Sequence, residues 1–257
     1  MKGLNIGIIG SGNVAFHLAK VFLEQQNEVS IFRRSDRNDT YFSQLIGIHR
    51  VNEIADFSND IEYCILAVND EKIKEVAEEI IGTNAFVLHT SGSISIDALS
   101  GLNFNNYGVF YPLQSFSINR KLSYRNIPVL LESYNENEYD KLDKLAHSFS
   151  DISQVCTSEK RKKLHLAAVI VNNFVNHLYV EVAELLESDK MNELLIPLIR
   201  ETASRLENEN AKSLQTGPAK RGDITIIEDH ISMLSEFPEL QKLYKIMSDS
   251  IRSKHNS

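Results

Sequence analysis

Cysteine is scarce in this sequence, with only Cys64 and Cys156 among 257 residues. One lies inside an apolar run and the other near the end of an expected strand, so nothing indicates a disulfide framework or a metal cluster. We therefore expect reduced thiols, no bound metal and a cytoplasmic location.

Long apolar runs are absent as well. No segment reaches the roughly 18 consecutive apolar residues that suggest a membrane span, and Leu4–Ile9 is short and runs directly into glycines. We expect neither an export signal nor a membrane as a partner.

Positive charge is in deficit, because 27 Lys and Arg residues face 35 Asp and Glu residues, a formal net charge of −8. The one longer basic run is Lys160–Lys163, which precedes a strongly helical segment. We interpret it as a solvated first turn, with a role near an anionic ligand as the alternative. No nucleic acid is expected as a partner.

The composition is otherwise that of a folded enzyme, with 42% hydrophobic and 24% charged residues. In the first part of the chain, apolar runs alternate with amphipathic helical periods, which predicts a parallel, doubly wound sheet. The expected strands are Leu4–Ile9, Glu28–Phe32, Ile61–Val68, Ala85–His89, Tyr107–Tyr111, Ile127–Leu131 and Ile152–Cys156. The expected helices between them are Asn13–Gln26, Glu71–Ile81 and Glu136–Phe149.

After Thr157 no strand pattern returns. A helix over Ser158–Glu187 would be about 45 Å long at about 1.5 Å per residue, enough to span a domain or a dimer. A second helix is expected over Met191–Asn208, where Pro197 must kink it or restart it. The fold class is thus α/β, a Rossmann domain over 1–157 followed by an all-helical domain over 158–257.

A glycine-rich turn leads from the first strand into the first helix. Gly10 permits a tight turn, Gly12 lets the backbone approach a pyrophosphate, and the small Ala15 lets the helix pack on the strand. The helix N-terminus favours the phosphates. A tight turn that binds nothing is the alternative. The predicted dinucleotide-binding residues here are Gly10, Ser11, Gly12, Asn13 and Val14.

The end of the second strand indicates which dinucleotide is bound. An acidic residue there would suit the ribose hydroxyls of NAD, whereas this chain has Arg33, Arg34 and Ser35. Two guanidinium groups and a hydroxyl suit a 2′-phosphate, so we predict NADP(H) as the cofactor. The alternative is that the arginines serve solubility, with Asp36 pairing with one of them.

Two later strands also end in small or polar residues. Val68 and Asn69 lie where one of them ends, and Ser91 follows the next. Open α/β sheets bind ligands beyond the carboxyl ends of their strands, so we place these residues near the cofactor. For Asn69 and Ser91 the alternative is a helix N-cap.

The long helix carries a polar seam in an apolar surrounding. His165, Asn172 and Asn176 fall within about 20° of one line at about 100° per residue, with Asn173 and His177 beside them. Buried amides need partners. We predict a ligand-facing role for the seam, with hydrogen bonds between helices as the alternative.

Four segments together carry a family resemblance. The chain resembles NADP oxidoreductases that join a Rossmann-like domain to a helical C-terminal domain of unknown function. These are relatives of pyrroline-5-carboxylate reductase, prephenate dehydrogenase and 6-phosphogluconate dehydrogenase. The segments are Gly10–Ala15, Tyr111–Ser117, Leu164–Phe174 and Thr216–Asp223. The resemblance implies a C-terminal domain like that of 6-phosphogluconate dehydrogenase, a homodimer through the long helices, and an active cleft between the domains.

Related hydroxyacid dehydrogenases place a catalytic Lys one helical turn before an Asn, but here Ala168 and Val169 occupy that turn. The remaining proton donor or acceptor is His165. The alternative is that His165 is a hydrogen-bonded interior histidine without a catalytic role. Tyr111, Gln114 and Ser115 could orient a carbonyl or imine, and Arg221 could hold a carboxylate. For these two groups the alternatives are a strand end and an ion pair with Asp223 or Glu228. The predicted catalytic residues are His165, Asn172, Asn173, Gln114 and Arg221.

The leading hypothesis is an enzyme that uses NADP(H) to reduce a C=O or C=N bond of a small, carboxylate-bearing metabolite, or runs the reverse oxidation. The alternative is an NADP(H)-binding sensor or assembly protein without turnover. A third interpretation uses a reduced deazaflavin as the hydride partner.

Overall fold

The computed structural model of the protein describes residues 3–35, 38–57, 60–186 and 189–255, and of Asp189 and Met191 only the backbone. The chain forms two compact units, Met1–Val169 and Ile170–Ser257. The expected domain boundary after Thr157 is where the long helix begins, but the first turns of that helix belong to the N-terminal unit.

Within the described residues, eight strands form one sheet in the order β3-β2-β1-β4-β5-β6-β7-β8. Every neighbouring pair is parallel except β6 and β7. The strands are β1 (Asn5–Ile9), β2 (Glu28–Phe32), β3 (His49–Val51), β4 (Tyr63–Leu66), β5 (Phe86–His89), β6 (Tyr107–Pro112), β7 (Val129–Ser133) and β8 (Ser153–Val155). The prediction of a doubly wound sheet is confirmed.

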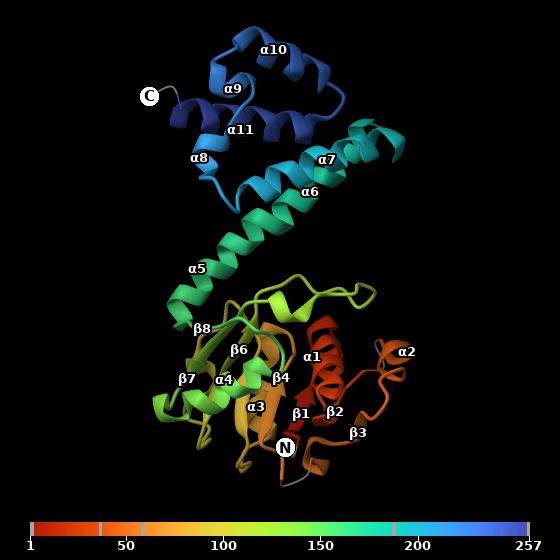
Figure 1. The fold of residues 1–257 in the computed structure, drawn as a ribbon, viewed down its shortest axis with the longest axis vertical. Coiled ribbons are helices and arrows are strands. Elements are labelled where there is room, and N and C mark those ends of the chain that lie inside the picture. The colour runs from red at the N-terminus through yellow and green to blue at the C-terminus, as the bar shows by residue number, and fades with distance from the viewer. Residues whose placement is uncertain (1–2, 36–37, 58–59, 187–188, 256–257) are drawn as a thin grey trace. The chain divides into compact units, whose positions relative to one another are not determined.

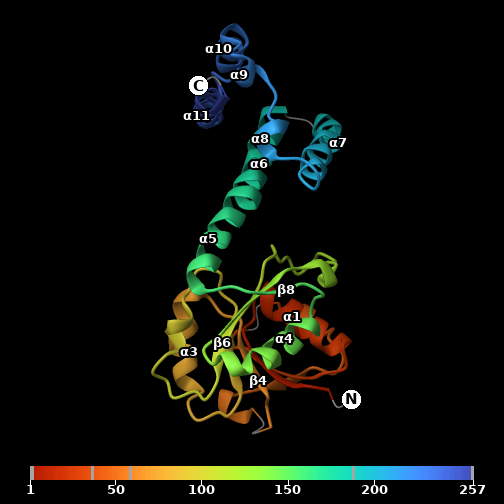
Figure 2. The same ribbon diagram turned by 60° about the vertical axis from the view of Figure 1, so that its left-hand side comes forward.

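Helices cover both faces of this sheet (Figures 1 and 2). The helices α1 and α4 pack on one face, and α3 with the turn η3 packs on the other. The helices are α1 (Asn13–Glu24), α2 (Asp39–Phe42), α3 (Ile73–Glu79) and α4 (Tyr139–His147). The 3₁₀ turns are η1 (Ile54–Asp56), η2 (Asp70–Lys72), η3 (Ile96–Leu99), η4 (Tyr124–Asn126) and η5 (Glu136–Glu138).

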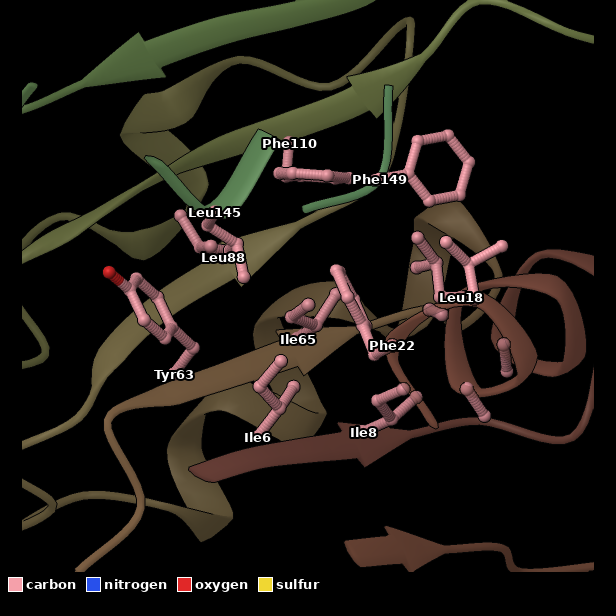
Figure 3. Close-up of a cluster of buried hydrophobic side chains, with 14 of the residues drawn as sticks. Ile6, Ile8, Leu18, Phe22, Tyr63, Ile65, Leu88, Phe110, Leu145 and Phe149 are labelled. Atoms are coloured by element: carbon pink, nitrogen blue, oxygen red, sulfur yellow. The ribbon is translucent and has the colours of Figure 1, made fainter. Parts of the chain in front are cut away.

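A continuous apolar core lies between the sheet and the helices α1 and α4. Phe22 of α1 meets Phe110 of β6 and Phe149, which follows α4, with ring centroids 6.3 Å away in both cases (Figure 3). Each of the three rings is fully buried, and burial of such a side chain is worth about 1.5–3 kcal/mol. This packing joins α1 and the end of α4 to the sheet.

The short elements α2 and β3 were not predicted from the sequence. Strand β3 has only three residues, of which His49 and Arg50 are exposed and Val51 is buried. So short a run gives no periodicity that separates a strand from a loop.

The second unit is helical throughout its described elements, as predicted. The long helix, expected over Ser158–Glu187, is seen from Ser158 to Leu186, and Glu187 lies outside the described residues. It consists of α5 (Ser158–Ala168), a π-helical turn η6 (Val169–Phe174) and α6 (Val175–Leu186). The helices that follow are α7 (Asp189–Arg205), α8 (Ala211–Leu214), α9 (Pro218–Arg221), α10 (Ile224–Met233) and α11 (Pro238–His255). Pro197 does not restart α7, which runs through it as one helix.

Many apolar side chains of the helical unit are exposed within a single chain. Val171 and Leu194 are each 70% exposed, and Leu198 is 64% exposed. By length and composition alone, with a mean hydropathy of 1.3, the helix Ser158–Leu186 could cross a membrane. The same properties suit a helix that another protein surface covers, so they do not overturn the expectation that no membrane is involved.

Candidate active site

The turn between β1 and α1 has a backbone that only glycine fits well. Gly10 has φ of +150°, and a Cβ there would lie 2.2 Å from the carbonyl oxygen of Ala67. Gly12 caps α1 without any side-chain hydrogen bond, and a Cβ on it would meet nothing within 4 Å. The first N–H groups of α1 therefore face open space, which is the arrangement that binds phosphate.

A cavity of about 290 Å³ lies over this turn. It spans the carboxyl ends of three adjacent strands, β2, β1 and β4. The lining residues are Ile9, Gly10, Ser11, Gly12, Phe32, Arg34, Ser35, Ala67, Val68, Asn69, Lys72 and Val76. Seven predicted cofactor-binding residues are among them: Gly10, Ser11, Gly12, Arg34, Ser35, Val68 and Asn69.

Two cations stand at this cavity, Arg34 after β2 and Lys72 in η2. Glu75 accepts a hydrogen bond from Arg34 Nη1 at 3.1 Å and another from Lys72 Nζ at 2.8 Å, and Glu79 accepts from Arg34 Nη2. These bonds, that of Lys72 first, hold the pKa of Glu75 below its ordinary value. Lys72 was not predicted. The one sequence feature that could have indicated a role for Lys72 is its position, as a basic residue in the first turn after a strand.

Arg33 lies elsewhere. Its side chain is 2% exposed, pairs with Asp39 and lies 4.5 Å from the centre of the Phe42 ring. The structure therefore places Arg33 in the packing under α2, and its predicted contact with the cofactor stays a prediction. Asp36, the alternative partner for an arginine, lies outside the described residues.

Three other predicted cofactor residues are engaged within the fold. Asn13 Nδ2 donates to the carbonyl of Phe116 at 2.9 Å, and Val14 packs against the core. Ser91 Oγ accepts from the N–H groups of Ser93 and Ile94, at 3.1 and 3.0 Å. Their roles toward a cofactor stay predictions.

Asn69 differs from Ser91 in this respect. It stands at the N-cap position of η2, but its side chain makes no capping hydrogen bond, and it lines the cavity. The helix-cap alternative therefore does not account for Asn69, whereas Ser91 organises its own turn.

Tyr111, near the end of β6, meets His165 of α5. Tyr111 Oη lies 3.0 Å from His165 Nδ1, with the rings edge to face. Gly92 lies beneath them, since a Cβ there would be 2.6 Å from His165 Nδ1 and 2.8 Å from Tyr111 Cζ. Burial raises the pKa of Tyr111, the charge of Arg161 opposes that rise, and Asp70 adds to it. Tyr111 is thus a protonated phenol whose Oη is within hydrogen-bonding distance of the imidazole of His165.

Of the remaining predicted catalytic residues, Gln114 belongs to the same unit as this pair, whereas Asn172, Asn173 and Arg221 belong to the second unit. Gln114 is exposed, and its Oε1 accepts from the N–H of Ser115 at 2.8 Å. Asn172 and Asn173 lie in the π-helical turn η6 of the second unit, exposed, with Asn172 Nδ2 donating to Asn173 Oδ1. Arg221 ends α9 and is exposed.

Within the polar seam of the long helix, His165 is half-buried at Tyr111, whereas Asn172 and Asn173 are exposed within one chain. The ligand-facing role of the seam stays a prediction. Among the described residues, no ion pair joins Arg221 to either of its alternative partners, Asp223 and Glu228, and Asp223 Oδ1 accepts from the N–H of Ile226.

Comparison with known proteins shows which family the chain belongs to. The family model described as NADP oxidoreductase, coenzyme F420-dependent, matches residues 5–100, and a domain of unknown function, DUF2520, matches residues 127–251. The solved structure described as putative NADP oxidoreductase BF3122 from Bacteroides fragilis is 33% identical over 98% of both chains, with a TM-score of 0.88. The chain belongs to this NADP oxidoreductase family.

More distant solved structures share the fold of this oxidoreductase. A reductive aminase from Aspergillus terreus, in complex with NADPH and ethyl levulinate, is 13% identical with a TM-score of 0.70 and covers 99% of this chain and 95% of its own. A 1-pyrroline-5-carboxylate reductase from Streptococcus pyogenes is 13% identical with a TM-score of 0.67 and covers 98% and 99%. No curated protein sequence matches the chain.

The oxidoreductase takes NADP(H) as its cofactor, and the residues present fit that group. The open space at Gly12 and the free N-terminus of α1 suit the pyrophosphate, while Arg34, Ser35 and Lys72 suit a phosphate on the adenosine ribose. When bound, the nicotinamide supplies or accepts the hydride, and the protein positions and polarises the reactants.

We expect Arg34→Met and Lys72→Met each to weaken NADPH binding about 10- to 100-fold while leaving NADH binding unchanged. Each variant removes one charge-assisted hydrogen bond to the 2′-phosphate, worth about 1.5–3 kcal/mol. Calorimetric titration with both dinucleotides measures the effect. Lys74→Met is the matched control, because Lys74 is exposed on the same segment and does not line the cavity. Equal losses for NADH and NADPH would contradict the assignment.

Proposed function

We propose that this oxidoreductase reduces the C=N or C=O bond of a small, carboxylate-bearing metabolite with NADPH, and that Tyr111 and His165 supply the proton. The observation that carries the proposal is the 3.0 Å contact between Tyr111 Oη and His165 Nδ1. Tyr111 stands at the end of β6, three strands from β1 in the sheet order, on the edge that the glycine turn and Asn69 also occupy. Ligands of open α/β sheets bind along this edge.

The chemistry of the pair suits the second half of such a reduction. Hydride addition to the carbon of a C=N or C=O bond leaves the nitrogen or oxygen in need of one proton. A phenol whose pKa is raised stays protonated at neutral pH and can donate its Oη proton to that atom, and His165 Nδ1 can replace it. In the reverse oxidation the same atoms take the proton up.

The names of the distant neighbours favour C=N over C=O. A reductive aminase and a pyrroline-5-carboxylate reductase both share this fold, and pyrroline-5-carboxylate is a cyclic imine with a carboxylate. Among the residues predicted from the sequence, Arg221 is the proposed carboxylate partner, because its guanidinium can bind both oxygens at once.

We also propose a cytoplasmic homodimer formed through the C-terminal helices. In a single chain α7 exposes Leu194 and Leu198 one turn apart, and α6 exposes Tyr179 and Val180. Soluble proteins rarely leave so much apolar surface uncovered.

The dimer has a direct test. Wild-type protein should show twice the chain mass in light scattering, and the Leu194→Lys/Leu198→Lys variant should show the mass of one chain. Glu193→Lys, at an exposed position of the same helix that is already polar, is the control and should stay dimeric. A wild-type protein that runs as a single chain would contradict the proposal.

The proposed function is tested by NADPH oxidation with a panel of cyclic imines, keto acids and aldehydes, with and without a carboxylate. We expect turnover with carboxylate-bearing cyclic imines and little with neutral aldehydes. If NADPH binds but is consumed with no member of the panel, the alternative of a sensor without turnover replaces the enzyme.

A further inference from the structure

Arg161 is buried in an unusual place. It is 0% exposed, yet it belongs to α5, where no other residue is buried. The prediction that Lys160–Lys163 forms a solvated first turn is therefore wrong at this position. A buried guanidinium destabilises the fold unless it is paired and hydrogen bonded. The partners of Arg161 therefore indicate its structural role.

Those partners come from three separate segments. Arg161 Nη1 pairs with Glu132 Oε2 of β7, and Nη2 donates to the carbonyl of Ile94 at 2.6 Å and to Ser158 Oγ at 3.1 Å. The Ser158 N–H and Oγ–H donate to Glu132 at 2.8 and 2.6 Å, and Ser158 Oγ also accepts from the N–H of Ile96. We name Arg161, Glu132 and Ser158 the clasp.

The clasp anchors the helix on the face of the sheet that carries the reacting pair. In the antiparallel β6–β7 pairing, Glu132 is opposite Val109 and Tyr111 is opposite Leu130. Residues two apart on a strand share a face, so Glu132 and Tyr111 point to the same side. Arg161 and His165 are four residues apart on α5 and therefore lie one above the other.

We propose that Arg161 is a positioning residue, which with Glu132 fixes the first turns of α5 so that His165 Nδ1 lies beside Tyr111 Oη. The inference rests on the proposed proton-donating role of Tyr111 and His165. Without the clasp, α5 would lose these hydrogen bonds to β7 and to the Ile94–Ile96 segment, and His165 would leave its place over Gly92. Misplacement of a reacting group by about 1 Å can cost about 100-fold in rate.

The charge of Arg161 also acts on Tyr111. It lowers the pKa of Tyr111 against the larger effect of burial, and Asp70 acts in the opposite direction. It also contributes, after burial, to the low pKa of His89. Glu132 faces Arg161 from β7, and Cys156, whose thiol Arg161 also influences, precedes the helix. Removal of the Arg161 charge should therefore raise the pKa of Tyr111.

The decisive variant is Arg161→Met/Glu132→Leu, which removes both charges and leaves neither one buried alone. Replacing a buried ion pair by apolar groups is often neutral for stability, so the variant should fold and keep its NADPH affinity. We expect kcat to fall about 10- to 100-fold, KM to change less than about threefold, and the alkaline limb of the kcat profile to move to higher pH. Arg161→Lys should recover only part of kcat, because Lys lacks the fork that reaches Glu132 and Ile94 together.

Lys162→Met is the matched control, since Lys162 is the exposed neighbour of Arg161. It should leave every measured quantity unchanged. A folded double variant with wild-type kcat would overturn the positioning role.

A second readout does not depend on turnover. In the wild-type protein Tyr111→Phe should shift the imidazole NMR signals of His165, and in the Arg161→Met/Glu132→Leu background that shift should be lost. An undiminished shift would overturn the inference. If Tyr111→Phe leaves kcat intact but the NMR coupling depends on Arg161, the proposed proton donor fails and the positioning contact stands.

Discussion

Tyr111→Phe is expected to lower kcat by about 10²- to 10⁴-fold, the range found when a general acid is removed, with NADPH affinity unchanged. The variant removes only the hydroxyl, which lies 3.0 Å from His165 Nδ1. Neither residue lines the cavity over the glycine turn, so cofactor binding should not respond. Single-turnover oxidation of NADPH together with a calorimetric titration separates the two quantities.

A second tyrosine and histidine provide the control. Tyr124 Oη lies 2.6 Å from His17 Nδ1 in the packing between α1 and η4, and neither residue lines the cavity. Tyr124→Phe makes the same chemical change and should reduce stability with little change in kcat. His165→Gln should lower kcat to a similar level as Tyr111→Phe, and the double variant should be no worse, because the two side chains act as one unit. If Tyr111→Phe and Tyr124→Phe have the same kcat, Tyr111 is not the proton donor.

The features that were predicted correctly depend on local sequence. Gly10 and Gly12 follow an apolar run and precede a helical period, and the structure gives them the tight turn and the open approach that the spacing implies. Strand β2 is seen with its predicted bounds, Glu28–Phe32. In these segments the hydrophobic periodicity alone indicates both the type of secondary structure and the face that is buried.

The different positions of Arg33 and Arg34 could not be predicted from the local sequence. They are identical in type and adjacent in sequence, yet one is buried against Asp39 and Phe42 and the other lines the cavity. The choice depends on α2, an element too short to be predicted. Lys72 was missed for a related reason, since its place at the cavity depends on the neighbouring order of β1 and β4.

Contacts between distant segments were the least predictable. His165 was selected by its chemistry, but its partner Tyr111 is 54 residues away and was assigned only to orienting a substrate. Arg161 was predicted to be solvated because its basic run precedes a strongly helical segment. Its pairing with Glu132 of β7 joins residues 29 positions apart in the sequence. A periodic pattern cannot contain this information, because it describes one element at a time.

Acid is expected to destabilise the N-terminal unit through His89. This side chain is fully buried in β5, and burial, with a smaller effect of the Arg161 charge, lowers its pKa to about 4 from an ordinary 6.5. The unfolded chain therefore binds a proton at a higher pH than the folded one does, so the free energy of unfolding falls as pH drops from 6.5 toward 4. The loss should reach about 2 kcal/mol at pH 5 and about 3 kcal/mol below pH 4.

His89→Asn isolates this contribution. The Asn oxygen can keep the hydrogen bond that His89 Nδ1 accepts from the N–H of Ser91 at 3.2 Å, but it does not titrate. In denaturant unfolding, the free energies of unfolding of the two proteins should depend on pH in parallel above pH 7. Between pH 7 and pH 5 the free energy of unfolding of the wild-type protein should fall by about 2 kcal/mol more than that of the variant. The burial of His17 also lowers its pKa, and this effect remains in both proteins, so it cancels in the comparison. Equal slopes in this window would mean that His89 is not the buried neutral histidine that holds the turn beneath Tyr111 and His165.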